Sequence, residues 1–142
     1  MASSAVTPVP SLSLPRAAGI LVAAVAAAIA VNALIAAIAV ALGVPATYGP
    51  VTVPAYASMT VLGLVVGWAG WRFISRRAAD PRRALAIAVP IVLVASFVPD
   101  VLLAVTRFIP GTTVGAVLAL GLMHVTTAAI AVPAYVLASR PR

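Results

Sequence analysis

Long apolar runs alternate with short polar or proline-rich segments along most of this chain. An α-helix needs about 20 residues, at 1.5 Å each, to cross the hydrocarbon core of a bilayer. A membrane β-strand would instead alternate apolar and polar residues over about ten positions, and these runs do not alternate. The pattern therefore predicts four membrane-spanning helices, at about 17–43, 53–74, 85–105 and 114–138.

The remaining segments fit one four-helix domain over 17–138. Residues 1–16 are small, polar and proline-rich and predict a flexible cytoplasmic tail, and residues 139–142 predict a second, short one. The middle connection, 75–84, is a compact charged loop, and the two other connections are rich in proline and glycine. Short connections between successive helices favour an all-α, up-and-down four-helix bundle in the membrane.

Composition supports lipid as the solvent for this bundle. Of the 142 residues, 64% are apolar and only 8% are charged, against about 25% charged in soluble domains. The chain has no cysteine, lysine or glutamate, which excludes thiolate and Schiff-base chemistry. One histidine and two aspartates are too few for a protein-only zinc or bis-histidine haem site. We expect no cofactor, and no nucleotide-binding or hydrolase motif is present.

The arginines predict the orientation. If both termini lie inside, eight of the nine arginines fall on the cytoplasmic side and only Arg107 falls outside. The net charge of +7 then reflects topology rather than nucleic-acid binding. The predicted location is a bacterial cytoplasmic membrane, with the lipid bilayer as the main partner.

Polar side chains within the predicted helices are the candidate site. Ionisable residues inside a membrane cost about 2.5–3.5 kcal/mol on insertion scales, so each one suggests a function. Asp100 is about 22 Å from the cytoplasmic side and His124 is near the midplane, as judged from the rise per residue. Asn32, Ser58 and Thr60 fall in the same outer half of the bilayer. We predict a polar pocket there, with Asp100 and His124 as an acid/base pair.

The predicted ligand-binding residues are Asn32, Ser58, Thr60 and Arg107. Structural alternatives stand beside this prediction. Asp100 can instead lie at the membrane surface and pair with Arg107, a contact worth about 0–1 kcal/mol. His124 can bond a helix carbonyl or Asn32 and act only as glue between helices, at about 0.6 kcal/mol.

Small residues predict close helix packing. Gly63 and Gly67 form a GxxxG pattern, and Gly111 and Gly115 form a second one. In lipid, such stripes allow helices to approach closely, either within one chain or between two copies. The sequence leaves both uses open, including a homo-oligomer.

The segments PDVLLAV and ALGLMHVTTAAIAVPAY, with the arginine-rich middle loop, resemble a family of small four-helix membrane proteins from actinobacteria. The family is catalogued only as a domain of unknown function, and the resemblance covers about 17–138. It implies a four-helix membrane fold without a known activity, and it singles out Asp100 and His124. Three functions follow as hypotheses: binding and transforming a small lipophilic molecule, proton-linked transport by an oligomer, or an accessory role in a membrane complex.

Overall fold

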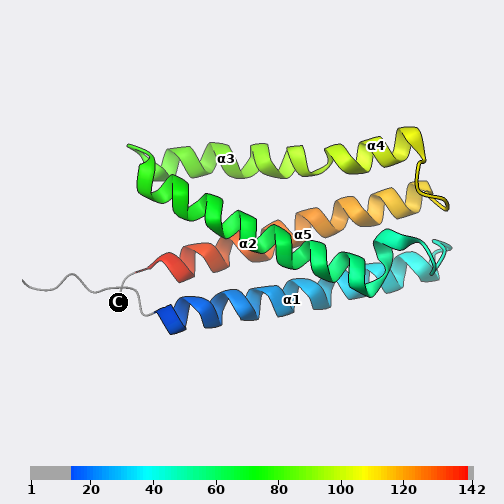
Figure 1. Ribbon diagram of the computed structural model, residues 1–142, viewed down its shortest axis with the longest axis horizontal. Coiled ribbons are helices and arrows are strands. Elements are labelled where there is room, and N and C mark those ends of the chain that lie inside the picture. Colours follow the sequence, from blue (N-terminus) through cyan, green and yellow to red (C-terminus); the bar gives the residue numbers. More distant parts are fainter. Residues whose placement is uncertain (1–13, 141–142) are drawn as a thin grey trace, which may run out of the picture.

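The computed structural model describes residues 14–140, which form long helices and one short 3-10 turn (Figure 1). Four helical segments are long and apolar enough to cross a membrane, which indicates a multi-pass membrane protein. This confirms the predicted all-α four-helix membrane bundle. The elements in chain order are α1 (Leu14–Ala41), η1 (Gly49–Val51), α2 (Val53–Arg77), α3 (Pro81–Ser96), α4 (Val98–Thr106) and α5 (Val114–Ser139).

The helix bounds differ from the predicted ones mainly at the charged end. Helix α1 begins at Leu14, so 14–16 are helical and do not belong to the predicted tail, while residues 1–13 and 141–142 lie outside the described part. The predicted loop 75–84 shrinks to 78–80, because α2 continues to Arg77 and α3 already starts at Pro81. Arginine is a good helix former, and its long side chain reaches the headgroup region from within a helix.

Asp80 caps the N-terminus of α3, which explains why this helix begins directly after the short connection. Its carboxylate accepts a hydrogen bond from the Arg83 backbone N–H at 3.1 Å, and Pro81 occupies the first turn. Proline fits there because the first N–H groups of a helix have no partner inside the helix.

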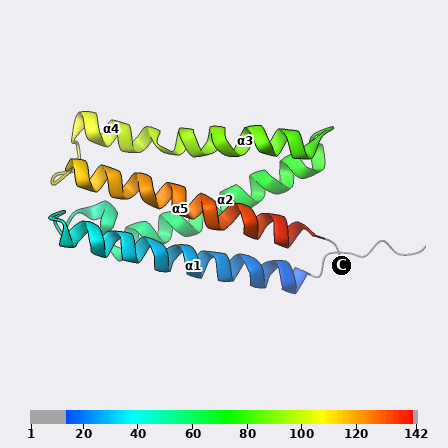
Figure 2. The ribbon, with the colours of Figure 1, turned by 180° about the vertical axis from the view of Figure 1, so that it is seen from behind.

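The third predicted helix is divided in two. Helices α3 and α4 follow one line in both views (Figures 1 and 2), but Phe97 separates them. The Ser96 hydroxyl donates to the Leu93 carbonyl at 2.6 Å, and Pro99 has no N–H to offer the preceding turn. The Ser96 bond and the missing N–H of Pro99 together interrupt the backbone hydrogen bonds of the helix, whereas Pro90 alone is accommodated inside α3.

Helices α1 and α5 make the most extensive contact in the molecule. Their shared face consists largely of alanines, and Ala28 and Ala116 are fully buried in it. Small side chains let two helix backbones approach closely in lipid. Helix α2 crosses this pair obliquely, from the end of α1 to the start of α3 (Figures 1 and 2).

The third span lies at the edge of the bundle. Helix α3 has no buried residue, whereas α4 buries Asp100 and Leu103 against its neighbours. The span contacts α2 through α3 and α5 mainly through α4, and only the α4 part buries side chains.

Three of the four predicted packing glycines contact side chains of the same chain. A Cβ on Gly67 would lie 2.6 Å from the Tyr135 hydroxyl oxygen, and one on Gly115 would lie 3.5 Å from Val44. Gly111 lies under Tyr48 in the turn before α5, with a φ of 87° that favours glycine. Gly63 faces open space. The homo-oligomer stays a prediction.

Candidate functional site

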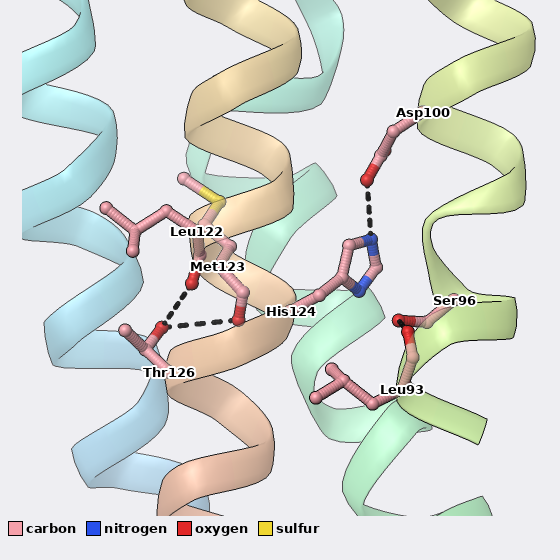
Figure 3. Close-up of polar contacts among 7 residues, drawn as sticks. All are labelled: Leu93, Ser96, Asp100, Leu122, Met123, His124 and Thr126. Carbon is pink, nitrogen blue, oxygen red and sulfur yellow. Dashed lines mark hydrogen bonds and ion pairs between the residues drawn. The ribbon is translucent and has the colours of Figure 1, made fainter. Parts of the chain in front are cut away.

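A carboxylate and an imidazole meet between α4 and α5. The Asp100 Oδ2 atom lies 3.2 Å from the His124 Nε2 atom, and the two side chains point toward each other (Figure 3). Asp100 is 5% exposed, while the His124 side chain is 38% exposed. The structure thus brings together the two residues predicted as the acid/base pair.

The contact is close but poorly directed. Within residues 14–140, Asp100 Oδ2 accepts no aligned hydrogen bond, although it is fully shielded from solvent. The 3.2 Å separation satisfies an ion pair by distance, whereas a hydrogen bond also requires the N–H to point at the oxygen. We therefore describe the pair as an electrostatic contact that leaves acceptor capacity on Oδ2.

The break at Phe97 helps to shape this site. The Phe97 ring meets the imidazole of His124 edge-on, with 5.8 Å between ring centres. Aromatic pairs favour this arrangement because the positive ring edge faces the negative ring face. Pro99 directly precedes Asp100 in the first turn of α4.

A shallow groove of about 390 Å³ runs between α4 and α5 beside the pair. Asp100 is the one charged residue in its lining, and all other lining residues are apolar or glycine. The lining consists of Phe97, Asp100, Val101, Val117, Leu118, Gly121, Leu122 and Val125. Several of these side chains are exposed on the outer surface of the bundle, so the groove opens sideways, toward the space that lipid occupies.

Asn32 belongs to a separate polar cluster. Its amide donates to the Thr60 hydroxyl at 2.9 Å and to the Thr127 hydroxyl at 3.1 Å, and the Thr126 hydroxyl donates to its carbonyl oxygen at 3.3 Å. This Asn32 cluster links α1, α2 and α5. Thr126 lies on the α1 side of α5, away from the side that carries His124 (Figure 3).

The predicted polar layer therefore splits into two groups. Asn32 and Thr60 share the Asn32 cluster, and Asp100 and His124 form the pair on another face of α5. Ser58 is exposed and donates only to the Ala55 carbonyl of its own helix.

Arg107 lies apart from both groups. It is exposed at the end of α4, in the left-handed conformation with a φ of 51°. Asp100 takes His124 as its partner, and it forms no ion pair with Arg107. The alternative pairing is therefore not the one that the structure adopts.

Sequence reasoning missed Phe97 and Gly121 as parts of the site. Each lies three residues before one member of the pair, Phe97 before Asp100 and Gly121 before His124. Residues three apart share a helix face, so this spacing was a usable signal. Gly121 leaves room for Phe97, because a Cβ there would lie 3.2 Å from the ring.

A third group of side chains lies at the arginine-rich end. The Tyr135 hydroxyl donates to the Leu64 carbonyl at 2.7 Å, and its ring packs between Trp68 and Trp71. Arg72 stacks over Trp68 at 5.6 Å, which suits an aromatic residue at a membrane surface. These residues anchor α2 to α5 and leave no acid or base facing a cavity.

Metal ligation has no support in the described part of the chain, where no three histidine, aspartate or glutamate side chains gather. Asp100 lines the groove and His124 contacts Asp100, so the pair can offer a proton, a hydrogen bond or a charge to a molecule there through Asp100.

Comparison with known proteins gives a family but no activity. No curated protein matches the chain. No solved structure matches it either. Residues 12–141 match a family of unknown function, DUF6069, and this match covers most of the 142 residues. The chain that carries the Asp100–His124 pair therefore belongs to the DUF6069 family.

Proposed function

We propose that this protein binds a small lipophilic molecule in the groove between α4 and α5, with Asp100 and His124 as the polar anchor. One observation carries the proposal: a carboxylate that is 5% exposed, with an unfilled acceptor position, lines a groove that is otherwise apolar. Ligand pockets in proteins combine largely apolar walls with a few polar groups that fix orientation.

The cost of the pair favours a binding role over structural glue. An aspartate in the membrane costs about 2.5–3.5 kcal/mol, whereas a hydrogen bond between membrane helices returns about 0.6 kcal/mol. The Asn32 cluster ties three helices together with neutral groups alone. If Asp100 and His124 served only to tie α4 to α5, neutral side chains would do so at lower cost.

The shape of the groove favours a ligand that arrives through the bilayer. Val101, Leu118 and Leu122 are 58%, 68% and 51% exposed, so the wall of the groove is continuous with the lipid-facing surface. A lipophilic molecule can therefore enter the groove laterally from the bilayer. The pair can also transfer a proton to or from such a ligand, since carboxylic acids and imidazoles are the common acid/base groups of enzymes.

Retention of a ligand through purification tests the proposal. The wild type, Asp100→Ala and His124→Ala are purified in mild detergent, and their organic extracts are compared by mass spectrometry. Ser58→Ala is the control, because Ser58 is exposed away from the groove and bonds only its own helix. Thermal unfolding of each variant checks that it is folded.

We expect a lipophilic species that the wild type and Ser58→Ala retain and that both site variants lose by at least about five-fold. This ratio corresponds to roughly 1 kcal/mol of binding free energy. Indistinguishable extracts from all four folded proteins would remove the groove as a binding site.

Lipophile binding is preferred over the two alternatives because of what surrounds the pair. A proton path needs successive polar groups, and the Asn32 cluster lies on another face of α5 from the pair. An accessory role draws on the bare surface of α3, but lipid covers such an apolar surface equally well.

We further propose that the bundle lies in a bacterial cytoplasmic membrane with both termini inside. Of the eight described arginines, seven lie at the end that holds the start of α1, the 78–80 turn and the end of α5 (Figure 1). Arg107 alone lies at the opposite end. Positive charge near the ends of spans favours the cytoplasmic side.

A further inference from the structure

Asp100 Oδ2 is a solvent-shielded acceptor without a donor in the described chain, and Asp100 lines the groove, so a donor in the groove reaches Oδ2 once the carboxylate turns toward it. The geometry points to a lipophilic alcohol with a slim, unbranched chain as the ligand of the groove, its hydroxyl donating to Asp100. This inference rests on the proposed function and specifies the chemistry of the molecule bound.

Charge selects a neutral head group. When Asp100 and His124 share one proton, the pair carries no net charge, whether that proton lies on the carboxyl group or makes the imidazole cationic. An ammonium group would bring an unbalanced positive charge among apolar walls, and a carboxylate head would face the charge of Asp100. A hydroxyl donates to the open acceptor position of Asp100 Oδ2 and brings no charge.

A hydroxyl also suits the protonation chemistry of the pair. An O–H group both donates and accepts. A ligand hydroxyl can donate to Asp100 Oδ2 and, at the same time, accept a hydrogen bond from an N–H of His124. An ether of the same chain lacks the donor and would leave Oδ2 unfilled.

The walls select a slim chain. The Phe97 ring lies over Gly121, where even a Cβ would come within 3.2 Å of it. The floor of the groove at this point is therefore narrow. Beyond it, Leu118 and Leu122 flank an open side, along which an alkyl chain can lie toward the bilayer.

Photo-labelling with a matched series of amphiphiles tests this inference. The probes are a twelve-carbon alcohol with a diazirine in its chain, its methyl ether and the corresponding primary amine. The full-length protein is labelled in lipid nanodiscs, and labelled residues are mapped by mass spectrometry. Labelling of Val101, Leu118 and Leu122 in the groove is compared with labelling of Val94, which is 68% exposed on α3 and outside the groove.

In the wild type we expect the alcohol to label the groove about ten-fold more than the ether does, relative to Val94. Ten-fold corresponds to about 1.4 kcal/mol, the size of one good hydrogen bond. In Asp100→Ala, which removes the acceptor and keeps the groove open, this preference should fall to about one.

The other outcomes separate the inference from the function on which it rests. Equal groove labelling by alcohol and ether, both above Val94, would overturn the alcohol and keep a lipophile-binding groove. Strongest labelling by the amine would replace the neutral head with a cationic one. Labelling no stronger than at Val94 for all three probes would overturn both proposals. The wild-type comparison needs no variant, so misfolding of Asp100→Ala does not spoil it.

Discussion

Asn32 and Asp100 are both buried polar residues in apolar helices, but their surroundings differ. Asn32 fills three hydrogen bonds with threonine hydroxyls from two other helices. Asp100 faces one histidine and retains an unfilled acceptor. A polar residue with all its partners inside the chain acts as a tie between helices, whereas one with a free acceptor beside a groove can act on a ligand.

The first prediction concerns the Asn32 cluster. Asn32→Ala removes three hydrogen bonds and leaves a small void, so we expect the free energy of unfolding to fall by about 1–3 kcal/mol. Thr60 and Thr126 keep their bonds to carbonyls of their own helices, which limits the loss. Unfolding by sodium dodecyl sulfate in mixed micelles measures the change.

Ser58→Ala is the matched control, because its single bond lies within α2 and its side chain is exposed. It should change stability by less than about 0.5 kcal/mol. A similar small change in Asn32→Ala would show that the cluster contributes little, and the structural role given to Asn32 would then be wrong.

The depth of the polar residues could be predicted from the sequence, but their direction around each helix could not. The rise per residue places Asn32, Asp100 and His124 near one level of the bilayer. Which face of α5 each one meets depends on how α1 and α4 pack around it. In runs of alanine, valine and leucine, every helix face is apolar, so hydrophobic periodicity does not show which face points into the bundle. The split between the Asn32 cluster and the pair therefore needed the structure.

At the scale of elements, the apolar runs predict the number of helices well because lipid requires each span to satisfy its own backbone. The break at Phe97 is the exception. Proline inside a membrane helix is normally tolerated as a kink, and Pro90 and Pro133 behave in this way. Near Pro99, the Ser96 hydroxyl also donates a hydrogen bond to the Leu93 backbone carbonyl. The break thus depends on two residues acting together, which a rule for single prolines does not capture.

The second prediction tests how α2 and α5 pack. A Cβ at Gly67 would lie 2.6 Å from the Tyr135 hydroxyl oxygen, which is already held by its bond to Leu64 and by two tryptophans. Gly67→Ala must push this ring away, so we expect a loss of about 1–3 kcal/mol of stability.

Gly63→Ala and Gly70→Ala are the matched controls on the same helix, because both positions face open space. The same detergent titration should place them within about 1 kcal/mol of the wild type, since alanine favours a helix over glycine. If all three alanine variants unfold alike, the close approach of Tyr135 to α2 does not limit the packing.

For the molecule as a whole, the uneven packing of the four spans relates to the proposed function. Helices α1, α2 and α5 share both buried apolar clusters and the Asn32 cluster. In the third span, α4 buries residues against these helices, whereas α3 has no buried residue. A groove between the firmly packed α5 and a peripheral span can widen for a ligand without disturbing the core.

The last prediction concerns how the bundle sits in the membrane, since the groove lies nearer the end that carries Arg107. The chain has no cysteine, so a single introduced thiol reports its own side. Ala79 lies in the exposed turn at the arginine-rich end, and Thr47 is exposed in the connection between α1 and α2 at the other end. In intact bacterial cells, a membrane-impermeant maleimide should label Thr47→Cys directly and Ala79→Cys only after permeabilisation. The reverse pattern would place the arginines outside, and labelling of both thiols in intact cells would mean that the chain inserts in two orientations. With the expected result, the groove opens into the outer half of the bilayer, and we then expect the proposed lipophilic ligand to come from the outer leaflet.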